Sequence, residues 1–210
     1  MTYQTFDPTA LSQPDLHAYL LAAIGPRPIA FASTVDREGR RNLAPFSFFN
    51  VFSSNPPIVV FSPARSGRDN TTKHTLDNVL EVPEVVINIV NYALVEQMSL
   101  ASTAYPKGVD EFIKAGLKPI ASQTVRPARV AEAPVALECS VEEVKALGDG
   151  PGAGNLIIAR VLRIHIQKDY LDADGSLDSS KLDLVARMGG SWYCRAWGDA
   201  LFEIPKPIRT

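Results

Sequence analysis

The segment from Asn42 to Ala64, NLAPFSFFNVFSSNPPIVVFSPA, contains no Asp, Glu, Lys or Arg. A stretch this poor in charge is either largely buried in a folded domain or placed in a membrane. Pro45, Pro56 and Pro57 exclude a membrane-spanning helix, because proline interrupts helical hydrogen bonding. The segment therefore predicts buried or half-buried strands with a loop between them, the last strand running from Ile58 to Ser62.

The polar groups of this segment are all neutral. They belong to Asn42, Ser47, Asn50, Ser53, Ser54, Asn55 and Ser62. Buried hydroxyls and amides need hydrogen-bond partners. Either the backbone or the polar edge of a bound heterocycle could supply these partners, and the segment by itself leaves both readings open.

Composition limits the class of protein. The chain has 210 residues, of which 46% are hydrophobic and 21% are charged, which is the balance of a globular protein and excludes a disordered one. Its formal net charge of −2 offers no general attraction to nucleic acid or to an anionic membrane. Without repeats, linkers or charge blocks, residues 1–210 are expected to form one domain, with a core over about 20–195 and a tail at 196–210.

Targeting signals are not visible in the sequence. The N-terminus lacks a basic region followed by an apolar one, and no apolar run approaches the roughly 18 residues needed to cross a bilayer. Cys139 and Cys194 lie far apart and leave one disulfide open, although a reducing compartment fits them best. We therefore expect a cytoplasmic protein without a membrane partner.

Hydrophobic periodicity predicts mostly strands. Alternation at period 2 indicates strands at Pro28–Val35, Val85–Val90 and Leu156–Gln167, and one or two strands over Arg129–Ala146. In the first of these, the even positions are small, which favours tight sheet packing over the close approach of a planar ligand. Asp36–Gly39 and Gly148–Gly154 are typical of turns.

Fewer segments carry helical signals. We expect a helix beginning near Thr71, an amphipathic helix at Tyr92–Ala104 and a short helix at Gly108–Ala115. Several strands with a few short helices indicate a mainly β protein with flanking helices, folded as a closed or split β-barrel.

The expected helix start has the composition of a phosphate-binding site. Arg68 and Lys73 add two cations, and Thr71, Thr72 and Thr75 add hydroxyls, to the free N–H groups of a helix N-terminus. A normally capped surface helix explains this segment about equally well. Taken with the neutral polar segment before it, the pattern fits a heterocycle that carries a phosphate.

Other catalytic patterns are absent. The sequence has no nucleophile elbow, P-loop or metal-binding spacing, and the glycine-rich run at 148–154 does not open a helix as a dinucleotide fingerprint would. No metal site is expected. His165 lies where the long strand turns polar, which suits either solvent or the rim of a pocket.

A set of blocks spread along the chain resembles the flavin reductase-like FMN-binding family. They are RPIAFASTVDREGRRNLAPFSFFNVFSSNPPIVVFS, KHTLDNV, EQMSLASTAYPKGVDEF, AEAPVALEC and ARMGGSWYCR, covering about Gly25 to Arg195. The resemblance implies a split β-barrel, usually a homodimer, that holds FMN near the subunit interface. Family members often reduce flavin with NADH or NADPH and supply it to a separate monooxygenase.

The resemblance also implies roles for individual residues. The ring wall would consist of Asn42, Ala44, Pro45, Phe46, Ser47, Phe48, Asn50, Ser53 and Ser62, with backbone N–H groups near Ala44–Ser47 serving as donors. Lys73 and Thr75 match the family's phosphate pattern, next to Arg68, with His74 in place of an acidic residue. His165 matches a histidine near the nicotinamide, and Arg187, Gly189 and Gly190 match a block that would close the pocket.

The implied activity is hydride transfer from nicotinamide to flavin N5. The flavin carries the electronic change, and the protein stacks the rings and offsets the developing charge. His165 would then orient the nicotinamide or donate a proton. Two alternatives stay open: a flavin-binding electron carrier without nicotinamide turnover, and an FMN-dependent enzyme that acts on an organic substrate.

Overall fold

The computed structural model describes residues 1–207, and its main element is one antiparallel sheet of seven strands. The sheet order is β2-β1-β5-β8-β9-β4-β3. The strands are β1 (Ala30–Val35), β2 (Arg41–Phe46), β3 (Phe49–Ser54), β4 (Pro57–Phe61), β5 (Glu84–Ile89), β8 (Val135–Ala146) and β9 (Asn155–Ile166). Two small sheets pair β6 (Pro119–Ile120) with β7 (Arg129–Val130), and β10 (Leu184–Arg187) with β11 (Tyr193–Ala196).

The two edges of the large sheet are β2 and β3, which follow each other in the chain. Only Ser47 and Phe48 separate them, so the sheet has to curl until its edges come together. The edges are joined by the chain and not by a strand ladder, and the N–H of Ser62 on the β4 side donates to the carbonyl of Phe48 at 2.9 Å. The predicted fold, a mainly β split barrel with flanking helices, is confirmed.

Strand β1 separates two hydrophobic clusters, and all of its residues are buried. Ile29, just before the strand, and Phe31 pack in one cluster, while Ala30 and Ala32 pack in the other, inside the barrel. The alternation of large and small residues therefore reflects packing on both faces of the strand. This agrees with the prediction that the small residues serve tight sheet packing.

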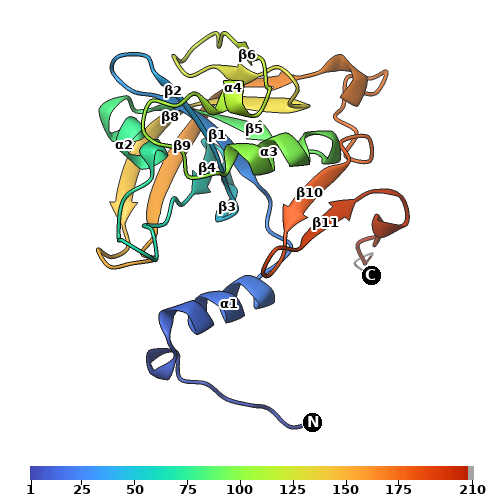
Figure 1. The fold of residues 1–210 in the computed structure, drawn as a ribbon. Helices are drawn as coiled ribbons and strands as arrows, with labels where there is room; N and C mark the ends of the chain where they lie inside the picture. The colour runs from blue at the N-terminus through green and yellow to red at the C-terminus, as the bar shows by residue number, and fades with distance from the viewer. Residues whose placement is uncertain (208–210) are drawn as a thin grey trace.

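The chain has four α-helices in its described residues. They are α1 (Gln13–Ala23), α2 (His74–Glu81), α3 (Val95–Ala101) and α4 (Glu111–Lys114), with short 3-10 turns at Pro8–Ala10, Tyr92–Leu94, Lys168–Tyr170 and Gly198–Ala200. Of the four, α2, α3 and α4 lie against the barrel (Figure 1). Leu76 and Val79 of α2 pack into the barrel cluster, whereas Met98 of α3 and Phe112 of α4 pack into the outer one. In the described residues no helix is long and apolar enough to cross a membrane.

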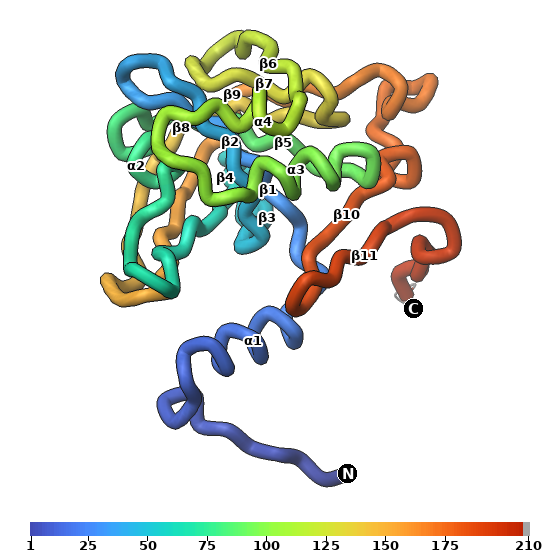
Figure 2. Tube along the Cα trace, viewed as in Figure 1, coloured from blue at the N-terminus to red at the C-terminus, as the bar shows by residue number. Residues whose placement is uncertain are grey.

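Helix α1 projects from the body as an arm, and none of its residues is buried (Figures 1 and 2). Arg27 ties its C-terminal end to the body: the guanidinium donates to the carbonyls of Leu21 and Ile24 and, at 2.9 Å, to that of Met188. A Cβ on Gly189 would lie 3.0 Å from the Cα of Ala22. The glycine thus allows the loop between β10 and β11 to pack against α1.

The predicted strands are confirmed within two residues at their ends, with Arg129–Ala146 divided into β7 and β8. The helix predicted from about Thr71 begins instead at His74. The carboxylate of Asp69 accepts the N–H and hydroxyl of Thr71, and Asn70 has φ of 58°, so the chain makes a turn there before it enters the helix.

Two other predicted helices are shorter than expected. Only Val95–Ala101 of the segment 92–104 is α-helical, after a 3-10 turn, and only Glu111–Lys114 of the segment 108–115. In the second case Gly108 has φ of 90°, and the carboxylate of Asp110 caps the helix through the N–H of Phe112, so the helix can begin only after this turn. Helix α1 and the β10–β11 hairpin were not predicted.

Candidate functional site

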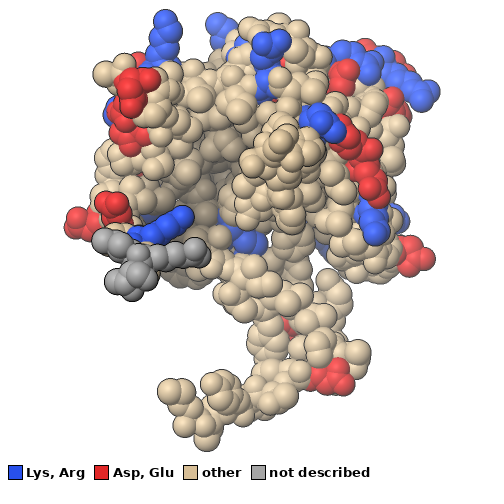
Figure 3. Space-filling model, turned by 180° about the vertical axis from the view of Figure 1, so that it is seen from behind, with Lys and Arg blue, Asp and Glu red and all other residues tan. Residues whose placement is uncertain are grey.

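Three adjoining cavities lie along the end of β2, and together we call them the β2 groove. The first, of about 250 Å³, lies between β2, residues 71–75 and residues 101–105. The second, of about 630 Å³, faces α1 and residues 62–68. The third, of about 240 Å³, faces β10 and β11. Pro45 lines all three, which makes the end of β2 the centre of the groove. On the face of the molecule turned away in Figure 1, the charged side chains lie mostly around the periphery of the surface (Figure 3).

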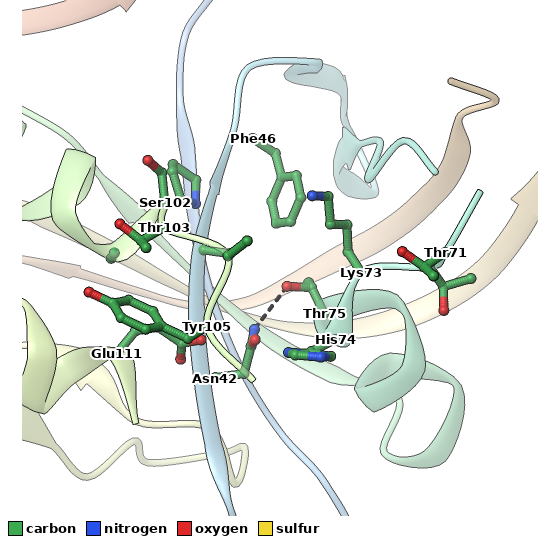
Figure 4. Close-up of a pocket in the computed structure, with 15 residues that line it drawn as sticks. Asn42, Phe46, Thr71, Lys73, His74, Thr75, Ser102, Thr103, Tyr105 and Glu111 are labelled. Atoms are coloured by element: carbon green, nitrogen blue, oxygen red, sulfur yellow. Dashed lines mark hydrogen bonds between the residues drawn. The ribbon is translucent and has the colours of Figure 1, made fainter. Parts of the chain in front are cut away.

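Buried hydrogen bonds connect residues of the first cavity. The amide Nδ2 of Asn42 donates to Oγ1 of Thr75 at 2.9 Å and lies 3.3 Å from Oγ1 of Thr34 (Figure 4). Nδ2 of Asn78 also donates to Thr34, at 3.1 Å. Thr75 thus uses its oxygen as an acceptor within the protein, and its hydroxyl hydrogen remains available to a ligand.

The cations of the groove lack acidic partners. Lys73 lines the first and second cavities, and Arg65 and Arg68 line the second. Within residues 1–207, none of the three has a carboxylate oxygen within 4.0 Å. Lys73 also stands at the N-cap of α2, which has no side-chain cap. Unpaired cations beside an uncapped helix N-terminus are suited to bind a phosphate.

Ser62 provides an independent sign that a polar ligand fits. Ser62 is only 7% exposed and lines the second cavity. Among the described residues its Oγ has no hydrogen-bond partner. A Cβ on Gly154 would lie 2.7 Å from this oxygen, so glycine there leaves the hydroxyl its space. A buried hydroxyl without a partner is costly, and a ligand atom in the cavity would satisfy it.

The exposed edge of β2 offers fewer backbone donors than predicted. The N–H of Leu43 donates to Oε2 of Glu111 at 3.0 Å, and Pro45 has no N–H. Neighbouring residues of an antiparallel edge strand point alternately inward and outward, so Ala44 and Phe46 direct their N–H groups to β1. The expected donors at Ala44 and Phe46 are therefore used inside the sheet, and the free backbone donors begin at Ser47.

Glu111 gives a first testable prediction. Burial raises the pKa of this carboxyl, partly opposed by the N–H groups of Leu43 and of Glu111 itself, and Asp110 adds a smaller upward contribution. Glutamine can accept the same N–H without a charge, so Glu111→Gln should leave the free energy of unfolding at pH 7 unchanged or raised. Glu111→Ala leaves the Leu43 N–H without a partner and should lower it by about 1–3 kcal/mol.

Chemical denaturation between pH 4 and pH 8 tests this prediction. Because the folded-state pKa is raised, the stability that the neutral carboxyl contributes is lost as the pH rises through that pKa. The free energy of unfolding of the glutamine variant should therefore increase relative to that of the native protein as the pH rises. Glu143→Gln, at an exposed position, is the control. A glutamine variant as unstable as the alanine variant would contradict the explanation.

The structure brings together most of the residues that the sequence predicted. Cavities of the β2 groove are lined by Asn42, Ala44, Pro45, Phe46, Ser47, Phe48, Ser62, Arg68, Lys73 and Thr75. Asn50 and Ser53 line none of the three. They lie on β3, where Oδ1 of Asn50 accepts the N–H of Val51 at 2.8 Å.

His165 is not brought to the β2 groove within one chain. It lies on the part of β9 that continues beyond β4, and it lines a separate cavity of about 340 Å³ with Arg129 and Gln167. Its Nε2 lies 2.7 Å from Oε1 of the buried Glu138. This contact gives His165 a structural partner, and its predicted role near a nicotinamide stays a prediction.

Sequence reasoning missed the wall formed by the end of α3. Ser102, Thr103 and Tyr105 lie on one side of β2, facing the segment of Thr71 and Lys73 across the first cavity (Figure 4). The signal in the sequence that could have indicated this wall is the group of three hydroxyl-bearing residues directly after an amphipathic segment. Their position depends on where α3 ends, which the sequence pattern placed three residues too late.

Comparisons with known proteins agree on one family. A family model described as a flavin reductase like domain matches residues 24–181. An uncharacterised protein from Aquifex aeolicus is 34% identical over 189 residues, covering 90% of this chain and 94% of the relative.

Two solved structures are similar to nearly the whole chain. Nitrilotriacetate monooxygenase component B from Bacillus cereus is similar over 97% of this chain and 100% of its own, with 30% identity and a TM-score of 0.90. A protein from Shewanella frigidimarina with a split barrel domain is similar over 99% and 100%, with 24% identity and a TM-score of 0.80. The second likeness supports the fold alone.

Proposed function

We propose that this protein, which belongs to the flavin reductase-like family, is an oxidoreductase that binds FMN in the β2 groove and reduces it with NADH or NADPH. Family membership supports flavin-related redox chemistry. The observation that carries the choice of FMN is the division of the groove. Cations without acidic partners and the N-terminus of α2 lie on the side of residues 65–75, and most other residues that line the first two cavities are uncharged, with Glu111 as the acidic exception.

The residues of the groove fit the parts of FMN. Lys73, the hydroxyl of Thr75 and the N-terminal N–H groups of α2 would hold the phosphate. Phe46 and Pro45 offer apolar surface for the ring, and Ser62 and Ser47 offer hydroxyl groups for its polar edge. The orphaned Oγ of Ser62 is the feature that such a ligand would complete.

The bound flavin would supply the hydride acceptor, so the chain needs no nucleophile of its own. The chain's residues hold the ring against β2, keep water from it and place donors where negative charge develops. The hydroxyl of Ser47 and the backbone N–H groups from Ser47 onward are the donors still available for this task, because the outward N–H of Leu43 is already bound to Glu111.

We also propose a homodimer as the working form. The arm α1 leaves Tyr19 and Leu20 49% exposed and Ile24, at its C-cap, 62% exposed, and the edge strand β3 leaves Val51 and Phe52 66% and 68% exposed. Exposed apolar side chains gathered on a projecting arm and on a sheet edge are typical of a surface that a partner chain buries. Light scattering coupled to size-exclusion chromatography should give twice the mass of one chain, and a monomer would contradict this assembly.

The comparison with the Bacillus cereus protein supports the proposal of a partner enzyme. That protein is a component of a monooxygenase, and the similarity spans nearly all of both chains. We propose that reduced FMN from this protein is used by a separate monooxygenase.

The direct test is NADH and NADPH oxidation by the purified protein, with and without added FMN. Oxidation should saturate with FMN, and the nucleotide with the larger kcat/KM is the donor. Binding of FMN without turnover of either nucleotide would contradict the reductase. It would favour an electron carrier or an FMN-dependent enzyme with an organic substrate instead.

A further inference from the structure

The third cavity of the β2 groove has a lining that FMN binding does not explain. It adjoins the other two cavities at Pro45, Ser47 and Ser102, but it does not include Lys73. Its remaining walls are apolar side chains of Ile29 and Met98 and the pair Arg187 and Tyr193 from β10 and β11. It therefore combines an apolar surface with a cation beside the proposed ring site.

Arg187 is placed by the hairpin and has donors to spare. Its guanidinium carbon lies 4.6 Å from the centre of the Tyr193 ring, and Nη2 donates to the carbonyl of Gly190 at 2.8 Å. A guanidinium has five N–H donors, so most of them are not used by these contacts. Within residues 1–207, no carboxylate oxygen lies within 4.0 Å of Arg187.

A second arginine lies behind the same wall. Arg27 is only 6% exposed, and Nε lies 3.4 Å from Oγ of Ser47, which lines the cavity. Its other contacts are backbone carbonyls, and the described residues offer it no carboxylate. Burial, and then repulsion from Arg187, lower the pKa of Arg27. The carbonyls offset part of this charge, but among residues 1–207 neither guanidinium group has a carboxylate partner.

We propose that the third cavity is a subsite for the anionic group, a carboxylate or a phosphate, of the compound that exchanges electrons with the bound flavin. Arg187 is the residue that selects for the anion, and Tyr193, Ile29 and Met98 contact the apolar part of the same compound. The inference rests on the proposed function, because the cavity adjoins the groove proposed to hold the flavin.

Benzoate and benzamide form a matched pair of probes, since they share the ring and differ in charge. Titrated into the FMN-loaded protein and followed by the absorbance of the bound flavin, benzoate should bind at least about tenfold more tightly than benzamide. Arg187→Gln should abolish this preference, and Arg187→Lys should keep part of it. Arg163→Gln, at an exposed position outside the cavities, should behave as the native protein.

Two further measurements show whether Arg187→Gln acts on the anion site or on FMN binding, and which compound supplies the anion. FMN affinity should change by less than about twofold in Arg187→Gln, because the phosphate-binding cations are elsewhere. NAD⁺ and NADP⁺, titrated in the same way, identify the source of the anion. If the substitution weakens either nucleotide as strongly as it weakens benzoate, the group is a nucleotide phosphate, and if it weakens benzoate alone, the group is the carboxylate of an organic substrate.

Equal binding of benzoate and benzamide to the native protein, or a preference for benzoate that survives in Arg187→Gln, would overturn the proposal. The same two probes can be compared by thermal shift on flavin-free protein. A sample that fails to bind FMN but stabilises more with benzoate than with benzamide would reject the proposed function and keep the anion site.

Discussion

Replacing Lys73 with alanine should weaken FMN binding by about 10- to 100-fold and leave riboflavin binding nearly unchanged. The two flavins differ only by the phosphate, so the difference between their losses measures what the cation does for that group. Lys73 lines both of the larger cavities and has no acidic partner among the described residues, so it is free to pair with a phosphate. Quenching of flavin fluorescence on titration gives both dissociation constants.

Lys145→Ala is the matched control, because Lys145 is an exposed lysine on β8 outside the groove. It should bind both flavins as the native protein does. Thr75→Ala is a poorer probe. Thr75 accepts from the buried Asn42 amide, and removing its hydroxyl leaves that amide with only the longer contact to Thr34. Equal losses of FMN and riboflavin in Lys73→Ala would exclude Lys73 from the phosphate site.

The strands of the barrel could be predicted because their signals are local. Period-2 alternation and the turns at 36–39 and 148–154 are contained in short windows, and the charge-free segment 42–64 became β2, β3 and β4. The blocks that resemble the family then supplied the topology. The residues predicted to hold a phosphate and a ring come from the same contiguous segments, which is why most of them line the β2 groove; their roles stay predictions.

Features set by competition between neighbours were harder to predict. Thr71 is a residue type that caps helices, but its hydroxyl donates to the carboxylate of Asp69 instead. The helix therefore begins three residues later, at His74. The backbone donors of β2 were overestimated because strand pairing decides which N–H groups face outward. Those of Ala44 and Phe46 point to β1, and Glu111, far along the chain, already occupies the outward N–H of Leu43.

The third cavity could not be predicted from the sequence for a related reason. Its charge depends on Arg27 and Arg187, which the bridge between their backbones brings together across most of the chain. The sequence showed Arg187 only as part of a block that resembles the family, and it gave no sign that Arg27 would be buried without a carboxylate. Unpaired charge is a property of the assembled fold.

Replacing Glu138 with alanine should lower the free energy of unfolding by about 3–5 kcal/mol, the largest stability effect that we expect for a single side chain. Its carboxylate is fully buried on β8. It accepts the N–H groups of Gln123 and Thr124 at 2.8 and 2.7 Å and the hydroxyl of Thr124, and Nε2 of His165 lies 2.7 Å away. Alanine would leave these donors without their acceptor, and it would leave Arg129, whose Nε lies 3.8 Å from Oε1, without its carboxylate partner.

The pH dependence gives this prediction its direction. Burial alone would raise the pKa of Glu138, but the hydrogen bonds from Thr124, Gln123 and His165 outweigh burial and lower it to about 2. A depressed folded-state pKa contributes stability that is present above the unfolded pKa, near 4.5, and is lost as the pH falls toward 2. The gap between native protein and Glu138→Ala in urea denaturation should therefore shrink below pH 4.5.

Glu142→Ala provides the control on the same strand. Glu142 pairs with Arg160 at the surface, where both side chains are about 40% exposed, and such pairs contribute at most about 1 kcal/mol. A comparable loss in both variants would show that burial of the Glu138 carboxylate is not the cause.

The same network decides between two roles for His165. If the histidine serves to hold Glu138, His165→Ala should lower stability and leave both FMN affinity and the rate of flavin reduction unchanged. If it orients the nicotinamide, as the family resemblance implies, reduction should slow while FMN affinity stays constant. Because His165 lies outside the β2 groove of its own chain, we expect the first result, and slowed reduction would require that a second chain bring it to the flavin.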